Sequence, residues 1–231
     1  MARTADHDLR RSQIAEAAHR LIAHAGLDAA TVAAVAREAG FSVGLVQHYF
    51  RSKDDLLLFT YRRTTDRQLG RVMRLVTEGE AARRTIAEIL LSALEELWPL
   101  DDRRRAEYRI GRAFHARSLD HPAVAEAAKA TAAGLRAQIA RAVDNGKRCG
   151  EVGLDADAET AALGLWALVN GLADQLYHEP ERPVGDRPLA ETAAGLLQEA
   201  LGSVFTGECH HHDPEWSDPL GLDGGAPSSS Q

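Results

Sequence analysis

Apolar residues recur at helical spacing along almost all of this 231-residue chain, and this feature restricts its fold more than any other. The first stripe has the spacing i, i+3, i+4, i+7, i+8, i+11 and consists of Ile14, Ala17, Ala18, Leu21, Ile22 and Ala25. No stretch sustains the alternation of apolar and polar residues, rich in β-branched side chains, that is typical of strands. We therefore predict an all-α protein without a sheet.

Two short helical segments joined by a tight turn follow the first stripe. Thr31 is a candidate N-cap for the segment that ends at Gly40, because its hydroxyl can accept from a free backbone N–H. Ser42 is the corresponding candidate for residues 43–49. Two short helices around the turn at residues 39–42 make a helix-turn-helix.

Helical patterns continue to about residue 205. We expect further helices from residue 53 onward and at 86–97, 101–119, 156–177 and 189–205. Another helix should carry Leu135, Ile139, Ala142 and Val143 and end near residues 145–146. Eleven of the 25 residues from 207 to 231 are Gly, Pro or Ser, a composition typical of disorder. The predicted organisation is a helix-turn-helix domain at 1–52, a helical ligand-binding and dimerisation domain at 53–206, and a disordered tail at 207–231.

Charge is distributed unevenly along the chain. Residues 1–65 hold nine basic and seven acidic residues, whereas the remainder holds 18 basic and 27 acidic ones. A mildly basic head on an acidic body is compatible with a DNA-reading module attached to a solvated regulatory domain. The polar start lacks the apolar core of a signal peptide, and no run of about 18 apolar residues could span a membrane. We therefore expect a cytoplasmic protein with no membrane partner.

Several features at fixed spacings lie between residues 14 and 57. They are the Ala-Ala pair of the first helix, Gly26, Thr31, Ala36, the Ala39-Gly40-Phe41-Ser42 turn, Gly44, and Phe50-x-x-Lys53-x-x-Leu56. This region resembles the DNA-binding domain of the TetR family of bacterial regulators. The stretches GLVQHYFRSKDDLL, PLDDRRRAEYRIGRAFHARSLDHP and WALVNGLADQL are similar to the BetI-like subgroup. The chain departs from the commonest pattern at Gln47, where many members carry Tyr.

The resemblance implies a three-helix DNA-binding domain joined to an all-helical ligand-binding and dimerisation domain. It implies a repressor that a small-molecule inducer releases from a palindromic operator in double-stranded DNA, with no cofactor. An activator, or a helical interaction protein without a small-molecule inducer, is the alternative. The sequence contains no HExxH, GxSxG, P-loop or GxGxxG motif, so we do not expect an enzyme.

Candidate DNA contacts lie on the second short helix and at two helix starts. The second helix of a helix-turn-helix enters the major groove, and backbone N–H groups at helix starts favour phosphate. Gln47 can offer a donor and an acceptor to a base edge. Gly40 and Gly44 should let the turn and this helix sit close to their surroundings, and core packing is the alternative role for Tyr49. The predicted contacts are Thr31, Arg37, Val43, Gly44, Leu45, Gln47, His48, Tyr49 and Lys53.

Two copies of a helix-turn-helix would read two half-sites, so we expect a homodimer. The last two predicted helices are rich in small and apolar residues, and the resemblance implies a four-helix interface there. The alternative is that these residues serve only the internal core. The predicted interface residues are Leu165, Leu168, Leu172, Leu197, Leu201 and Val204.

A ligand cavity is expected between the connecting helices, where the scarce large aromatic residues of the body gather. Its predicted apolar residues are Trp98, Tyr108, Phe114 and Trp166, and its predicted polar residues are Arg109, Arg112, His115 and Asn170. Each polar residue has a surface or core role as its alternative.

Two cysteines, Cys149 and Cys209, lie far apart in the sequence and do not indicate a disulfide framework. The run from Cys209 to Asp213 could bind Zn²⁺ or Cu²⁺, but consecutive residues cannot easily all face one ion. We therefore predict a tail without a built metal site.

Overall fold

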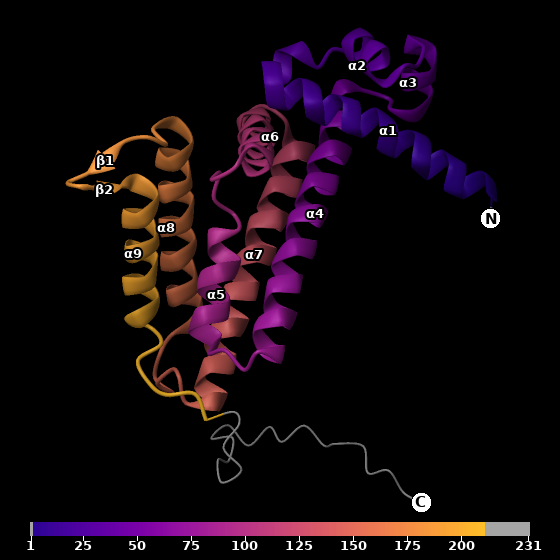
Figure 1. Cartoon of the computed structure of the whole chain (residues 1–231). Coiled ribbons are helices and arrows are strands. Elements are labelled where there is room, and N and C mark those ends of the chain that lie inside the picture. The colour runs from indigo at the N-terminus through magenta and orange to yellow at the C-terminus, as the bar shows by residue number, and fades with distance from the viewer. Residues whose placement is uncertain (1, 211–231) are drawn as a thin grey trace, which may run out of the picture.

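A computed structural model of the chain describes residues 2–210, which form an elongated helical molecule with a small head set across the end of a longer body (Figure 1). The head comprises α1 (Ala2–Ala25), α2 (Val32–Ala39) and α3 (Val43–Tyr49), with one 3-10 turn, η1 (Leu27–Ala29). The body comprises α4 (Lys53–Ala81), α5 (Ile86–Glu95), α6 (Asp102–Ser118), α7 (Pro122–Cys149), α8 (Ala158–His178) and α9 (Leu189–Gly202). The all-α fold predicted from the sequence is confirmed.

The helix starts in the head follow directly from the sequence. The hydroxyls of Thr31, Ser42 and Ser52 each accept from the backbone N–H three residues on, at 3.1, 3.2 and 3.0 Å. Between α2 and α3, Gly40 has φ +72°, a left-handed conformation that favours glycine. The N–H of Phe41 then donates to the carbonyl of Ala36 at 2.8 Å, which closes the turn between the two helices.

Two apolar cores run through the molecule. The first lies in the body, between α5, the second half of α7, α8 and α9. The second fills the head, but it also contains Leu56 and Tyr61 of α4, Phe114 of α6 and Val124 of α7. The head is therefore packed on the body through a continuous core, and the predicted boundary at residue 52 marks a change of helix rather than a break in packing.

Helix α7 extends further than the sequence predicts, because it passes the expected end near residues 145–146 and runs to Cys149. Gly146 allows this. A Cβ there would lie 2.6 Å from Cγ2 of Val152 and 3.0 Å from the Phe205 ring, so only a glycine permits this close approach inside the helix.

A small hairpin contradicts the prediction that the chain forms no sheet. Strands β1 (Pro183–Val184) and β2 (Arg187–Pro188) pair antiparallel, with Val184 opposite Arg187. Gly185, in the two-residue turn, has φ +62°. Strands of two residues are too short to show any alternation in the sequence, which is why the pattern did not reveal them.

The prediction of a disordered tail is wrong for its first four residues, 207–210. The N–H of Gly207 donates to the carbonyl of Glu151 at 3.0 Å, and the N–H of His210 donates to that of Cys149 at 2.7 Å. Residues 207–210 are therefore fixed on the end of the body, while the rest of the predicted tail, 211–231, lies outside the described residues. Within residues 2–210 no helix combines the length and apolarity needed to cross a membrane.

Candidate DNA-reading face and ligand cavity

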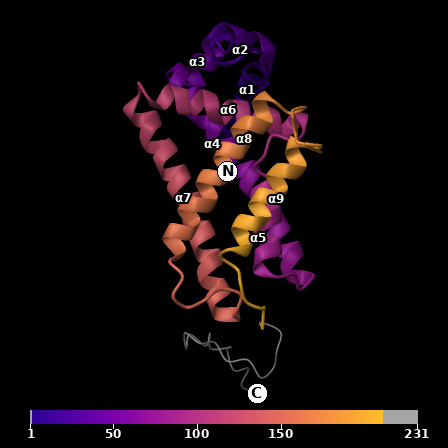
Figure 2. The ribbon, with the colours of Figure 1, turned by 90° about the vertical axis from the view of Figure 1, so that its left-hand side faces the viewer.

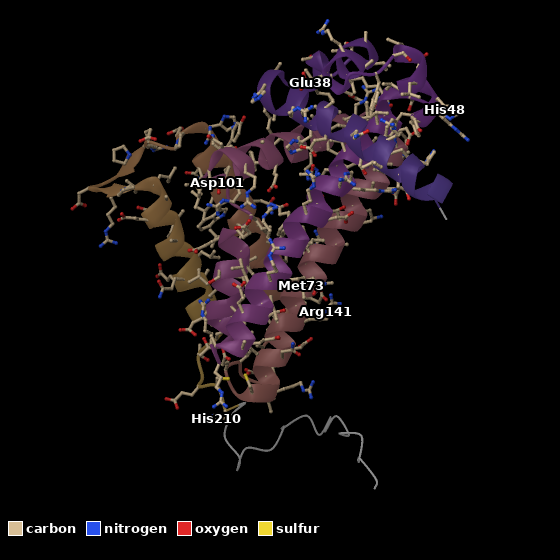
Figure 3. The ribbon with its side chains drawn as sticks, turned by 45° about the vertical axis from the view of Figure 1, so that its right-hand side comes forward. Glu38, His48, Met73, Asp101, Arg141 and His210 are labelled. Carbon is tan, nitrogen blue, oxygen red and sulfur yellow. The ribbon has the colours of Figure 1, made fainter. Side chains whose placement is uncertain are left out.

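Helix α3 presents one exposed face on the outer side of the head. Val43, Gly44, Gln47 and His48 are exposed and lie on the same side of the helix, whereas Val46 on the opposite side is buried at 1% exposure. His48 points outward from the edge of the head, away from the body (Figure 3). An exposed helix of this length, with an amide and an imidazole on its outer face, is suited to the major groove.

The other predicted DNA contacts are placed less uniformly. Thr31 and Arg37 are exposed, whereas Leu45, Tyr49 and Lys53 are half-buried. The Tyr49 ring lies 4.8 Å from that of His7 and 5.3 Å from that of His48, so it packs partly against its own domain. A Cβ on Gly44 or Gly40 would meet nothing within 4 Å. The expected close packing within the chain is therefore wrong for both glycines. Of the two positions, only 40 favours glycine, because its φ is positive.

Polar and cation–π contacts join α1 to α2, to α4 and to the residue that follows α3. Arg20 of α1 donates to Glu38 of α2 at 2.8 Å. The guanidinium of Arg11 lies 4.9 Å from the Phe50 ring and 4.4 Å from the Phe59 ring. Helix α3 itself is held by Val46, which belongs to the apolar core of the head.

A cavity of about 580 Å³ lies in the body beneath the head. It is lined by residues of α4, α6, α7 and α8 together with Leu97 and Leu119, which adjoin α5 and α6. Its wall mixes apolar side chains such as Leu135 and Val169 with polar ones such as Thr64 and Gln68. A cavity of this size and mixed lining can take a small amphipathic molecule.

Five of the eight predicted ligand residues line this cavity, namely Tyr108, Arg112, His115, Trp166 and Asn170. The other three do not. Trp98 is fully buried, and its indole N–H donates to the carbonyl of Val169 at 3.2 Å. Phe114 is also fully buried and stacks on Tyr61, with ring centroids 3.8 Å apart. Arg109 turns toward the head instead.

The contribution of α4 and α7 to the cavity was not predicted from the sequence. The additional lining residues are Tyr61, Thr64, Thr65 and Gln68 of α4 and Thr131, Ala132 and Leu135 of α7. The sequence did contain one indication that α4 contributes to the cavity. Thr60 and Thr64 are polar residues on the buried face of α4, where apolar residues are expected. Both hydroxyls donate to carbonyls of their own helix, at 2.8 and 2.9 Å.

The charged groups around the cavity are largely paired. Glu107 is 7% exposed and accepts from Arg71, which also donates to Glu96 at 2.6 Å. The pKa of Tyr108 is raised, first by burial and then by its hydrogen bond to Asp174 at 2.9 Å. Desolvation, followed by the charge of Arg112, lowers the pKa of His115, which favours its neutral form at pH 7.

Helix α6 links the cavity to the head and to α8 through three arginines. Arg109 donates to the carbonyls of Ala23 and His24 at the end of α1, at 2.9 and 3.2 Å. Arg117 donates to Asp54 in the first turn of α4 at 2.8 Å. Arg105 donates to the carbonyl of Tyr177 near the end of α8 at 2.9 Å. The helix that forms one wall of the cavity is thus anchored at the base of the head.

Helices α8 and α9 lie side by side on the outside of the body, facing the viewer in Figure 2. Among the predicted interface residues, Leu165, Leu172, Leu197 and Leu201 are at most 5% exposed and belong to the core of the single chain, so they cannot form a contact surface as proposed. Leu168 and Val204 are half-buried. The outward face of the two helices instead carries Leu163, 59% exposed, and Leu196, 44% exposed.

A helix-turn-helix head with an exposed second helix, set on a helical body with a cavity, defines a DNA-binding regulator. Family models agree with this class. The model of bacterial regulatory proteins of the TetR family matches residues 14–58, and that of the C-terminal domain of BetI-type transcriptional repressors matches residues 86–202. The chain belongs to the TetR family and is a transcriptional regulator, and members of these families are not enzymes. Regulators of this family bind operator DNA and act as dimers.

Individual relatives are consistent with this assignment. The HTH-type transcriptional regulator PksA of Bacillus subtilis is 30% identical over 188 residues, which make up 81% of this chain and 88% of PksA. BetI of Burkholderia mallei is 28% identical over 71% of this chain and 80% of its own length.

Solved structures show the same architecture. A transcriptional regulator from Rhodococcus sp. Rha1 is 30% identical, with a TM-score of 0.71 over 85% of this chain and 96% of that one. A regulator from Saccharomonospora viridis, solved in complex with choline, is 26% identical, with a TM-score of 0.69 over 82% of this chain and 93% of that one.

Proposed function

We propose that the chain is a repressor that binds a palindromic operator as a homodimer and leaves it when a small amphipathic molecule enters the cavity. The observation that carries the proposal is the position of α6. This helix contributes Tyr108, Gly111, Arg112 and His115 to the cavity wall and joins the head through Arg109. A molecule in the cavity therefore contacts the helix that supports the reading head.

The release mechanism follows from the geometry of two half-sites. A ligand that displaces α6 moves the end of α1 through Arg109 and the start of α4 through the Arg117–Asp54 pair. In a dimer this changes the separation of the two α3 helices, while the pitch of DNA keeps the half-sites fixed. A coupling of about 1–3 kcal/mol would lower operator affinity by roughly 5- to 150-fold.

The lining of the cavity favours a ligand whose polar end is uncharged. Glu107, the acidic residue among the described lining residues, is neutralised by Arg71, and the guanidinium of Arg112 lies 3.7 Å from the carboxylate of Asp174. Thr64, Gln68 and Asn170 offer neutral hydrogen-bonding groups. The choline complex of the Saccharomonospora viridis relative supports a small amphipathic ligand in this fold, although the described lining offers a quaternary ammonium ion no unpaired carboxylate.

The test is a tryptophan fluorescence titration run beside operator binding. The probes are choline and a series of neutral amphipathic alcohols and amides of increasing chain length. We expect the neutral compounds to quench Trp166, which lines the cavity, and to weaken operator binding; Trp166→Phe should remove the quenching. Trp98 is fully buried and outside the lining, so Trp98→Phe is the matched control. Quenching of Trp166 with unchanged operator affinity would refute induction and leave only a binding cavity.

A further inference from the structure

Three chemically reactive side chains meet at the end of the body opposite the head. Cys149 ends α7, Glu151 follows it in the next turn, and Cys209 lies beyond α9. The two sulfur atoms and the carboxylate oxygen all lie within 4.8 Å of one another. Sulfur atoms are visible beside the labelled His210 at the lower end of the body in Figure 3.

The backbone fixes Cys209 at this place. Gly207 and His210, on either side of it, donate to the carbonyls of Glu151 and Cys149. A Cβ on Gly207 would lie 2.1 Å from the carbonyl oxygen of Gly150, so the two segments approach as closely as glycine allows. The pairing of the cysteines therefore results from the fold, and it brings together residues 60 positions apart.

The third side chain is a buried carboxylate with spare acceptor capacity. Glu151 is 2% exposed and accepts from the N–H groups of Ile86 and Ala87, at 2.8 and 3.0 Å, at the start of α5. The Cys149 thiol also donates to this carboxylate at 3.4 Å. Each carboxylate oxygen has a further lone pair, so the group can cap α5 and bind a cation at once.

We propose that Cys149, Cys209 and Glu151 bind one Zn²⁺ ion. Two thiolates and one carboxylate suit a thiophilic d¹⁰ cation that prefers four ligands in a tetrahedral arrangement. Water takes the fourth position. Binding replaces one proton on each thiol by a bond to the metal and releases both protons to solvent.

The same two cysteines could form a disulfide, and the surroundings favour the metal. A protein that binds bacterial DNA works where thiols are kept reduced. A disulfide requires no carboxylate beside its sulfur atoms, whereas a Zn²⁺ ion requires further ligands. A bound ion would tie the segment after α9 to the end of α7 and, through Glu151, to the start of α5.

The experiment uses the full chain, reduced and freed of metal. Co²⁺ is added as the spectroscopic probe and then displaced with Zn²⁺. We expect one Co²⁺ per chain, with the near-ultraviolet charge-transfer absorption of a thiolate ligand, complete displacement by Zn²⁺ and a rise in unfolding temperature with Zn²⁺. Cys209→Ser leaves Cys149 as the one thiolate of the site, so it should reduce the thiolate band. It should also weaken Zn²⁺ binding by more than ~10- to 100-fold, which is the cost of losing an outer-shell partner.

Control variants separate this site from the histidine run. A His211→Ala/His212→Ala chain should keep the thiolate band, and circular dichroism should show that Cys209→Ser remains helical. Cys209 is half-buried, so serine is expected to be tolerated there. Metal binding that survives in a Cys149→Ser/Cys209→Ser chain would place the metal on the histidines and overturn the proposal. A reduced wild-type chain that binds no Zn²⁺, or readily oxidises to a Cys149–Cys209 disulfide in its presence, would overturn it equally.

Discussion

Arg109 is the residue whose role the structure changes most. The sequence placed it among ligand contacts, but its guanidinium reaches the end of α1 and satisfies the carbonyls of Ala23 and His24, which the helix leaves free. Nothing in the sequence near Arg109 indicates this partner, because the two segments are about 85 residues apart.

We predict that Arg109→Ala weakens the coupling between the cavity and the head. Hydrogen bonds from a charged group contribute about 1.5–3 kcal/mol, which is comparable with a typical allosteric coupling of about 1–3 kcal/mol. The variant should bind ligand normally, whereas ligand should weaken operator binding less than it does in the wild type, because the Arg117–Asp54 pair still joins α6 to α4. Operator affinity measured with and without ligand tests this, with Arg141→Ala on the exposed side of α7 as the control. Full retention of the ligand effect in Arg109→Ala would show that coupling takes another route.

The pair Asp54–Arg117 gives a second prediction at this scale. The hydrogen bond from Arg117 lowers the pKa of Asp54, so the link is present above the ordinary carboxyl pKa and is lost as pH falls through the lowered value. Arg117→Ala should raise the pKa of Asp54 toward its usual range, as followed by carbon NMR of the carboxyl group. The pKa of Asp157, lowered by hydrogen bonds from Thr160, should stay where it is. An unchanged Asp54 pKa would mean that Arg117 does not hold this carboxylate in solution.

At the scale of the element, helix starts were predictable and helix ends less so. Thr31, Ser42 and Ser52 each cap a helix as their residue type predicts, because capping depends on neighbours within three residues. The end of α7 depends instead on Val152 and Phe205, which pack against Gly146 from elsewhere in the chain. In the sequence, a glycine at this place predicts the end of the helix. The tertiary packing shows that the helix continues past it.

Two glycines of α7 provide a matched test of this packing. Alanine is about 1 kcal/mol better than glycine inside a helix, so Gly134→Ala, where a Cβ meets nothing within 4 Å, should stabilise the protein slightly. Gly146→Ala should destabilise it by about 1–3 kcal/mol, because its Cβ would overlap Val152 and Phe205. Midpoints of denaturant unfolding compare the two. Equal effects of both substitutions would show that the end of α7 is looser than the structure indicates.

At the scale of the whole molecule, the sequence predicted the order of the helices and the all-α architecture, but not which apolar residues face outward. Leu163 and Leu165 are both leucines of one helix, yet one is 59% exposed and the other 3%. Periodicity identifies an apolar helix, whereas the choice of inner face depends on neighbours that the sequence does not place. For the same reason, the large aromatic residues of the body were correctly taken to indicate a cavity, but Trp98, one of the residues predicted to line it, belongs to the core.

The outward face of α8 and α9 leads to a prediction about assembly. Leu163→Glu and Leu196→Glu should each give monomers, because a charge buried without a partner at an interface costs several kcal/mol. Both side chains are exposed in the single chain, so the variants should still fold. Met73→Glu, at an exposed position on α4, should remain dimeric in sedimentation experiments. Dimers in both leucine variants would place the interface on another face.

We expect the exposed face of α3 to read operator DNA, and the DNA upstream of the chain's own gene is the first operator to test. Fluorescence anisotropy at fixed salt should show binding at least about 10³-fold tighter than to random DNA. Gln47→Ala should reduce that ratio, because a contact from Gln47 to a base edge contributes about 1–3 kcal/mol of binding free energy to discrimination between sequences. Lys53→Ala should weaken binding to all sequences and lower the salt slope by about one. If the protein binds this DNA no more tightly than random DNA, or if neither substitution changes binding, then α3 does not read operator DNA.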